Sequence, residues 1–488
     1  MVSTSLKRIS PQSAASGFFL LFLAVSAAFA LFYQFLLISY PHQLDYGEGP
    51  LVNHAIRLAG GEMIYQPDLD TPPYTVTNYP PLYILIIAAG RLLFPSAPPF
   101  LFGRLISFIS TWAAAMAIGA IIHKDTNQWK ASLAGALIFG CIPFVFYWSA
   151  LLRIDMLALA LSLWGLYLVV SKPDSVTHLI FAAILLLAAI YTRQSYGLAA
   201  PLAAFVHLLT KDWRKAFFFA FGLGSAGLLI FLIANLVSDG GFYLHIIIAN
   251  QNQFSLERGV ELVKYFAQKG MLPLLATIPM LVMQKANHNL RPLLITYLLG
   301  SLASALTAGK IGSSYNYLME ISAATALGFG LFFNFLSKIQ FKSKWFLAVY
   351  PIMIVLALIS MTNTQATMLK NFLASREIGL KNEAESIRLA QDAGGIVLAD
   401  RNNNPILAIG QPIYFQFFER VQMANDGNWQ IQPFVAEIKD KKFSLIILTK
   451  DIFTKERWTP EMFDALNLSY TLQHVVGKSE FYYPKPGD

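Results

Sequence analysis

The sequence predicts a polytopic α-helical membrane protein with about eleven spans, interfacial helices in its first exterior loop and a small C-terminal α/β domain. Of the 488 residues, 56% are hydrophobic and only 13% are charged, whereas soluble domains carry about 25% charged residues. Apolar runs recur as far as residue 360. Because only helices or closed barrels satisfy the backbone in lipid, and the alternating strands of a barrel are missing from the sequence, we expect helices.

Each apolar run is long enough to count as a candidate span, and the first is expected to be a retained signal anchor. It is longer than the apolar part of a cleaved signal and lacks the small-residue cleavage pattern. The predicted spans are 16–38, 103–122, 131–150, 155–170, 178–192, 196–210, 215–237, 271–285, 291–308, 317–336 and 344–361.

One further apolar segment, "YPPLYILIIAAGRLLFP" at residues 79–95, is not expected to cross the membrane. Between its prolines lie about 14 residues, which as a helix measure about 21 Å against a hydrocarbon core of about 30 Å. The segment also carries Arg91. It therefore predicts an interfacial helix within the first exterior loop, residues 39–102.

The basic residues support this choice and fix the expected orientation. If 79–95 does not cross, one side of the membrane collects almost all the basic turns, while the other holds mainly isolated cations. The positive-inside rule then predicts a cytoplasmic N-terminus and an exterior or periplasmic C-terminal domain, in the plasma (inner) membrane. The residues expected in the cytoplasm are Lys7, Arg8, Lys124, Lys130, Lys172, Lys211, Arg214, Lys215, Lys285, Arg291, Lys338, Lys342 and Lys344.

The net charge of +8 is explained by this bias and by affinity for anionic membrane lipids, and nucleic acid is not an expected partner. The single cysteine, Cys141, excludes a disulfide framework and a cysteine-based zinc site.

Carboxylates and isolated cations gather on the expected exterior face. "HQLDYGEGPLVNHAIRLAGGEMIY" places two carboxylates between glycines just beyond the first span, and other polar groups lie at helix ends on the same side. The candidate catalytic residues are Asp45 and Glu48, and the candidate substrate-binding residues are Tyr79, Arg153, Asp155, Arg193, Lys310, Tyr315 and Tyr317.

These residue types suit transfer of a group from an anionic lipid. Arginine or lysine can stabilise a leaving phosphate, and a carboxylate can take the proton of an attacking hydroxyl. Glycine beside Asp45 lets the backbone approach a ligand closely. Simpler explanations stay open: "DYGEG" as a solvated turn, Asp155 as a helix cap, and the tyrosines as an interfacial aromatic belt.

The same segments resemble the C-type (GT-C) glycosyltransferases, especially the branch with the protein O-mannosyltransferases and the lipid A aminoarabinose transferase. The resemblance rests on "LDYGEGPLVNHAIRLAGGEMIY", the proline-led "NYPPLYILIIAAGRLLFP", "GRLISF" at the next span and the exterior turn "RID". It implies a polyprenyl-phosphate sugar donor, a glycan, lipid or protein acceptor, and inversion by single displacement on the exterior face.

Two departures limit how residues are carried over. Many relatives have an adjacent Asp-Glu pair, whereas Asp45 and Glu48 are separated by Tyr-Gly, so either acid could be the base; Asp45 is favoured. Tyr79 stands where the aminoarabinose transferase has a basic residue, which argues against the same donor. Metal use varies in the superfamily, so no cofactor is predicted and a divalent metal stays possible.

The composition changes near residue 363, which predicts domains at 1–361 and 362–488. "REIGLKNEAESIRLAQDA" predicts an amphipathic helix, "GGIVLAD", "FSLIILTK" and "YTLQHVV" predict strands, and "TPEMFDALNL" predicts a helix capped by Thr459. Two other functions stay open: a transporter or flippase for a lipid-linked sugar, and a non-catalytic polysaccharide-assembly protein. A transporter predicts charges at mid-membrane depth and internal repeats, which the sequence lacks.

Overall fold

The computed structural model describes residues 11–282, 289–338 and 344–486. Five of the described helices are long and apolar enough to cross a membrane, and several shorter apolar helices lie between them, so the chain is a multi-pass membrane protein. The basic residues Lys7, Arg8, Lys285 and Lys342, like the last residues of the predicted span 271–285, lie outside the described residues, as does the side chain of Lys344.

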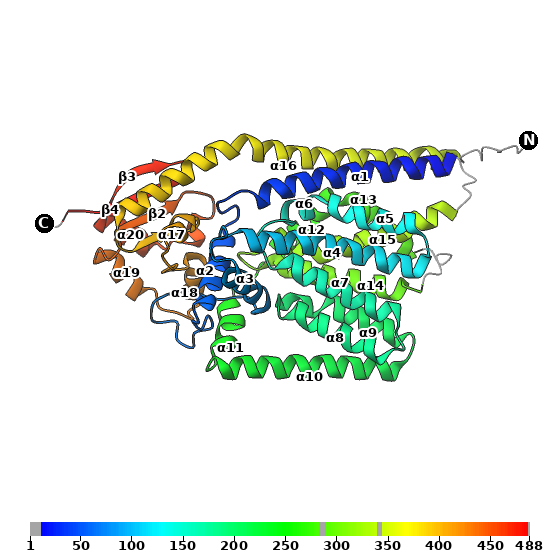
Figure 1. Ribbon diagram of the computed structural model, residues 1–488, viewed down its shortest axis with the longest axis horizontal. Coiled ribbons are helices and arrows are strands. Elements are labelled where there is room, and N and C mark those ends of the chain that lie inside the picture. The colour runs from blue at the N-terminus through cyan, green and yellow to red at the C-terminus, as the bar shows by residue number, and fades with distance from the viewer. Residues whose placement is uncertain (1–10, 283–288, 339–343, 487–488) are drawn as a thin grey trace, which may run out of the picture.

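A bundle of helices fills one end of the elongated molecule, and the C-terminal domain fills the other (Figure 1). Each predicted span overlaps helical structure among its described residues. The bundle helices are α1 Pro11–Ile38, α4 Leu101–Thr126, α5 Trp129–Cys141, α6 Pro143–Trp148, α7 Asp155–Ser171, α8 Val176–Ile190, α9 Ala199–Leu209, α10 Trp213–Val237, α13 Met271–Val282, α14 Arg291–Leu306, α15 Met319–Lys338 and α16 Lys344–Ala393.

The segment 131–150 is not one helix, and that prediction is wrong in detail. α5 ends at Cys141 and α6 begins at Pro143, with Ile142 in an extended conformation between them. Proline lacks the N–H that a continuing helix needs, and it disfavours the helical conformation of the residue before it. The loop 238–270 also contains helices that the sequence analysis did not predict, α11 Gly241–Ile246 and α12 Leu256–Lys269.

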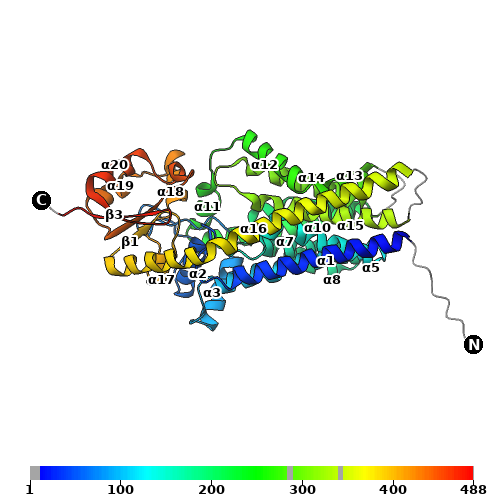
Figure 2. The same cartoon turned by 90° about the horizontal axis from the view of Figure 1, so that it is seen from above.

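Residues 39–102, predicted to be the first exterior loop, contain two short helices, α2 Glu48–Ala59 and α3 Leu82–Leu93, which pack against each other. Both lie at the end of the bundle that faces the C-terminal domain (Figures 1 and 2). The 12 residues of α3 correspond to about 18 Å of helix. This length is shorter than a hydrocarbon core of about 30 Å, as expected for a segment that does not cross.

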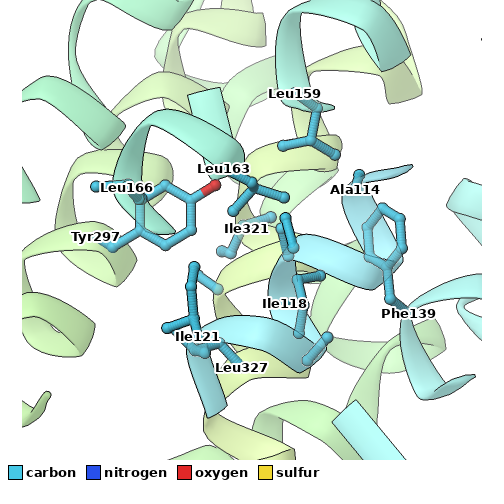
Figure 3. Packing of buried hydrophobic residues seen from close by; sticks show 14 of the residues in the cluster. Ala114, Ile118, Ile121, Phe139, Leu159, Leu163, Leu166, Tyr297, Ile321 and Leu327 are labelled. Atoms are coloured by element: carbon cyan, nitrogen blue, oxygen red, sulfur yellow. The ribbon is translucent and has the colours of Figure 1, made fainter. Parts of the chain in front are cut away.

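The core of the bundle is apolar and closely packed (Figure 3). α4, α5, α7, α14 and α15 supply Ile118, Phe139, Leu163, Tyr297 and Leu327, all of them buried. Small residues let the helices approach, because a Cβ on Gly330 of α15 would lie 3.2 Å from the Cα of Gly135 in α5. Close backbone approach of this kind stabilises helix pairs in a membrane, where lipid offers no hydrophobic driving force.

The 50-residue helix α16 connects the bundle to the C-terminal domain (Figures 1 and 2). At 1.5 Å per residue it spans about 75 Å. The predicted boundary at residue 361 falls inside it, and the amphipathic segment expected after residue 375 is its last part. The composition changes where the helix passes from the bundle to the C-terminal domain, and its backbone continues without a break.

Beyond α16 the chain forms a four-stranded sheet in the order β1-β2-β4-β3. β1 and β2 are parallel, with Val397 opposite Leu445, and the other pairs are antiparallel. The strands are β1 Val397–Ala399, β2 Leu445–Thr449, β3 Tyr470–Val476 and β4 Ser479–Pro484, and the helices are α17 Asn404–Ala408, α18 Phe417–Asn425, α19 Gln432–Lys439 and α20 Pro460–Ser469. The three expected strands and the Thr459 cap, which accepts a hydrogen bond from the Met462 N–H, are present, whereas β4 was not predicted.

Candidate functional site

Asp45 lies in the irregular segment between α1 and α2 and is held by one oxygen. Its Oδ1 accepts a hydrogen bond from the Gly47 N–H at 3.1 Å and lies 3.1 Å from Nη1 of Arg153. Both charged side chains are largely buried, at 15% and 6% exposed. The ion pair therefore joins the segment between α1 and α2 to the turn before α7.

Glu48, the second predicted catalytic residue, is fully buried and is saturated with hydrogen bonds. Arg104 of α4 donates to both its oxygens, at 3.0 Å and 2.8 Å. The N–H groups of Leu44 and Leu152 donate at 2.7 Å and 2.8 Å. Burial acts to raise the pKa of Glu48, but Arg104 and these N–H groups outweigh it and hold the pKa below its ordinary value.

Glu48 thus ties the Asp45 loop to the turn that carries Arg153. Arg104 extends the connection, because it also donates to the carbonyl oxygens of Leu37, Tyr40 and His42 at the end of α1. The sequence analysis quoted Arg104 only within "GRLISF", and its role as the partner of Glu48 was missed.

Gly47 is required for the position of Arg153. A Cβ built on Gly47 would overlap the Arg153 guanidinium. That guanidinium also lies 5.1 Å from the ring centre of Trp148 and 5.8 Å from that of Tyr46, within the range of cation–π attraction. The glycine of "DYGEG" therefore serves the approach of a cation from another turn.

Asp155 and Arg193 form a second buried ion pair. Asp155 begins α7 and accepts a hydrogen bond from the Trp148 indole N–H at 2.7 Å. Arg193 lies just before the 3-10 turn η1 Gln194–Gly197, with its guanidinium 4.5 Å from the ring centre of Tyr317. Asp155 is therefore the partner of a predicted cation, a role that its helix-start position alone does not reveal.

Three predicted cations meet at one polar cavity of about 250 Å³. Arg153, Arg193 and Lys310 come from three separate turns, and Tyr79 and Tyr317 line the same cavity. Arg153 and Arg193 each have a carboxylate partner, whereas Lys310 forms no ion pair within the part of the chain that the structure describes. Burial and the nearby Arg193 lower the pKa of Lys310.

Four of the predicted site residues do not line this cavity: Asp45, Glu48, Asp155 and Tyr315. Asp45 and Asp155 each hold an arginine that does. Tyr315 lies instead among aromatic rings, 5.5 Å from Tyr265 and 5.7 Å from Phe144 between ring centres. Its position favours packing over substrate contact.

The cavity also contains polar groups that the sequence analysis did not single out. Amides and hydroxyls line much of it, from Asn78, Gln194, Ser195, Asn250, Asn252, Ser313 and Asn316. Four of them lie in polar stretches of the sequence, Gln194 and Ser195 in "TRQSYG" and Asn250 and Asn252 in the loop 238–270. Hydrophobic periodicity cannot show that residues of such stretches share a site.

The C-terminal domain reaches the cavity through α18. Phe418 lines it and packs so tightly on Gly312 that a Cβ there would overlap the ring. The neighbouring Glu419 is buried, and burial raises its pKa to about 7, although Arg153 acts in the opposite sense. This contribution was not predicted residue by residue, because it depends on how two distant segments dock.

An apolar groove of about 670 Å³ lies beside the polar cavity, between α8, α9 and α10. Tyr191 and Gly197 line the groove, while Arg193, Gln194 and Ser195 between them in sequence line the cavity. The turn after α8 therefore separates an apolar space among the bundle helices from a cationic one.

Over the described ranges, no cluster of three or more histidine, cysteine, aspartate or glutamate side chains is arranged to hold a metal. His42, which lies close to Asp45 in sequence, contacts the side-chain amide of Asn404 at 3.1 Å.

No protein family and no curated protein matches the sequence, but several solved structures match the fold. ArnT from Cupriavidus metallidurans bound to undecaprenyl phosphate has a TM-score of 0.60 at 13% identity, over 96% of this chain and 98% of that chain. Archaeal oligosaccharyltransferase AglB from Archaeoglobus fulgidus, in complex with an inhibitory peptide and a dolichol-phosphate, has a TM-score of 0.53 at 10% identity, over 96% and 74%. The arabinofuranosyltransferase AftD from Mycobacteria has a TM-score of 0.51 at 15% identity, over 96% and 42%.

These structures share the GT-C fold, so the chain has the fold of the GT-C superfamily. The resemblance predicted from the first exterior loop, the proline-led helix and the "RID" turn is confirmed at that level.

Proposed function

We propose that the chain is a glycosyltransferase that moves a sugar from a polyprenyl-phosphate donor to a hydroxyl acceptor on the exterior face of the plasma (inner) membrane. The acceptor hydroxyl belongs to a glycan, lipid or protein, and the reaction inverts the anomeric centre. The observation that carries the proposal is the convergence of Arg153, Arg193 and Lys310 on one polar cavity, with Asp45 paired to the first of them.

The cations suit a leaving phosphate. When the bond between sugar and phosphate breaks, negative charge grows on the phosphate oxygens, and fixed cations in a site with little water stabilise it strongly. The two arginines are held by Asp45 and Asp155, which fixes their direction, while Lys310 has no such partner among the described residues. The amides and hydroxyls of the lining suit the hydroxyl groups of a sugar.

The apolar groove beside the cavity suits the polyprenyl tail. Its lining is almost wholly aliphatic and aromatic, and Tyr191 and Gly197 of that lining flank the turn whose Arg193 lines the cavity. Two of the similar structures, ArnT and AglB, are bound to undecaprenyl phosphate and a dolichol-phosphate, which supports a lipid-phosphate partner for this fold.

Asp45 is proposed as the general base. A hydroxyl is a poor nucleophile unless its proton is removed as the new bond forms. Oδ1 of Asp45 makes both the contact with Arg153 and that with Gly47, which leaves Oδ2 for an acceptor hydroxyl. Because Arg153 lies between Asp45 and the cavity, we place the acceptor on the Asp45 side of Arg153 and the donor phosphate on the other.

A transporter or flippase is the main alternative, but the positions of the charges favour an enzyme. Arg153 and Asp155 stand at the start of α7, and Arg193 stands between α8 and η1. Each lies at a helix end, whereas a transporter places charges in broken helices near mid-membrane.

The decisive experiment incubates the purified protein with a panel of polyprenyl-phosphate sugars and hydroxyl acceptors, and measures release of polyprenyl phosphate. We expect release with one donor class, and a loss of at least about 10²-fold in Asp45→Asn, which keeps the shape but removes the base. A transporter or an assembly scaffold would release none, and in reconstituted vesicles a transporter would move the intact lipid-linked sugar.

The proposed orientation is tested separately by labelling single cysteines in a Cys141→Ala background. Labels at 124–130 and 211–215 should be accessible from the cytoplasm, and labels at 62–70 from the exterior. A cytoplasmic label at 62–70 would contradict an exterior active site.

A further inference from the structure

The side-chain amide of Gln43 connects the segment that carries Asp45 to the C-terminal domain. Nε2 of Gln43 donates a hydrogen bond to the Arg401 carbonyl oxygen at 3.0 Å, and its Oε1 accepts one from the Asn403 N–H at 3.0 Å. The amide thus pairs with the backbone at two points. Residues 400–404 follow β1 at the carboxyl end of the two parallel strands, the edge at which α/β sheets usually present their functional loops.

The loop 400–404, which contacts Gln43, is in turn hydrogen-bonded to α16. The side-chain amides of Asn402 and Asn404 donate to the two oxygens of Glu383 at 2.5 Å and 2.8 Å. Glu383 belongs to the part of α16 that runs along the C-terminal domain. The loop's position is therefore fixed by the helix that connects this domain to the bundle.

The surfaces of the two parts fit closely around this contact. A Cβ on Gly49, near the start of α2, would lie 2.8 Å from the Cβ of Asn403. Further along, the Asn53 side chain accepts a hydrogen bond from the Ile413 N–H at 2.9 Å. The contact is thus part of a docked interface; Gln43 lies two residues before Asp45, and Tyr46, whose ring centre lies 6.4 Å from that of Phe418, directly follows it.

We infer that Gln43 is a positioning residue, through which the C-terminal domain holds Asp45 in the geometry needed for reaction; the inference rests on the proposed function of Asp45. The Asp45 segment lies outside regular structure between Tyr40 and Gly47. Glu48 and Arg104 hold it from the bundle side, and Gln43 holds it from the other. Gln43 does not line the cavity, so it acts through Asp45.

The chain offers a matched control in Gln411. Its Oε1 accepts a hydrogen bond from the Val397 N–H at 3.2 Å, and its Nε2 donates to the Gly395 carbonyl oxygen at 2.6 Å. This is the same two-point contact, but both partners lie within the C-terminal domain. A general loss of stability in that domain would affect Gln411 variants as much as Gln43 variants.

We expect Gln43→Ala to lower kcat by about 10- to 100-fold, the effect of a small misplacement of a reacting group, with the donor KM unchanged. Gln411→Ala should retain the kcat of the wild type. Equal losses in the two variants, or a wild-type kcat in Gln43→Ala, would overturn the inference.

Gln43→Glu tests the hydrogen bonds themselves. At neutral pH the introduced carboxylate can only accept, so it faces the Arg401 carbonyl oxygen without a proton to donate. Once protonated, it has one donor and one acceptor and can restore both contacts. Its kcat relative to wild type should therefore rise as the pH falls, and a flat ratio would count against positioning by these bonds.

A second measurement does not depend on turnover. Hydrogen exchange of the full-length protein should become faster at the N–H groups of residues 44–48 in Gln43→Ala, while residues 397–399 keep their protection. If the wild type released no polyprenyl phosphate, the proposed function would fail, yet exchange would still decide whether Gln43 orders this loop. Unchanged exchange at 44–48 would reject the contact's role.

Discussion

Replacing Glu48 by glutamine should damage the fold far more than the chemistry. Whichever way the new amide turns, its NH2 group meets at least two donors. On the Oε1 side these are Nε of Arg104 and the Leu152 N–H, and on the Oε2 side they are Nη2 of Arg104 and the N–H groups of Leu44 and Asp45. The buried arginine also loses its counter-charge.

The size of the effect follows from burial. Both side chains of the Glu48–Arg104 pair are 0% exposed, and breaking such a pair from one side costs about 3–5 kcal/mol. A matched control exists in Glu62, which pairs with Nε of Arg57 at 2.7 Å but is 57% exposed. Glu62→Gln removes the same charge from an arginine, Arg57, that is itself only 3% exposed, but because Glu62 lies mostly in water we expect a smaller cost than for a pair buried on both sides.

Thermal unfolding of the two variants in detergent, followed by tryptophan fluorescence, measures this difference. Turnover is then compared at a temperature at which both variants are folded. We expect a clearly lower melting temperature for Glu48→Gln, and a smaller loss of turnover than in Asp45→Asn. If Glu48→Gln melted like Glu62→Gln but reacted about 10²-fold more slowly, Glu48 would be the reacting carboxylate and the assignment of the base would be wrong.

Three further predictions concern the rim of the cavity. Gly47→Ala should lower kcat/KM for the donor by about 10- to 100-fold, because the added Cβ would displace Arg153 from a charge-assisted hydrogen bond worth about 1.5–3 kcal/mol. The control is Gly60→Ala, at the other end of α2, where the backbone conformation is similar. This variant should retain activity. Since the pKa of Lys310 is lowered, affinity for polyprenyl phosphate should fall as the pH rises through that pKa, whereas Lys310→Arg should bind to higher pH because arginine stays charged. Burial raises the pKa of Glu419 from 4.5 to about 7, so the melting temperature should fall as the pH rises between these values, where only the unfolded state is ionised; in Glu419→Gln that dependence should disappear.

Much of the fold could be predicted from the sequence, because the hydropathy of a segment depends only on its own residues. Apolar runs located the bundle helices, and the short helix predicted within 79–95 is α3. The failures have local causes as well. Pro143 interrupts an apolar run without changing its hydropathy, and the polar part of α16 looks like a new segment although the backbone continues.

The site is predicted less completely, because its geometry depends on pairs that are distant in sequence. The exterior turns identified Arg153, Arg193 and Lys310 as cations of one face, and the structure places them around one cavity. Nothing in the local sequence shows that Glu48 faces Arg104, 56 residues away. The contacts of Gln43 with residues 401 and 403 are more distant still.

The choice of the base is where this limit matters most. Three carboxylates near the cavity, Asp45, Glu48 and Asp155, each have an arginine partner, so neither residue type nor charge distinguishes them. They differ in whether one carboxylate oxygen is left without a hydrogen-bond or ion-pair partner among the described residues. Both oxygens of Glu48 accept hydrogen bonds from Arg104 and the backbone, and both oxygens of Asp155 have partners, the Trp148 indole and Arg193. A general base must have a lone pair that faces the hydroxyl it deprotonates. Asp45 alone of the three has an oxygen for which no hydrogen bond or ion pair is found among the described residues, and its other oxygen is held by Arg153 and Gly47, which fixes the direction of the free one.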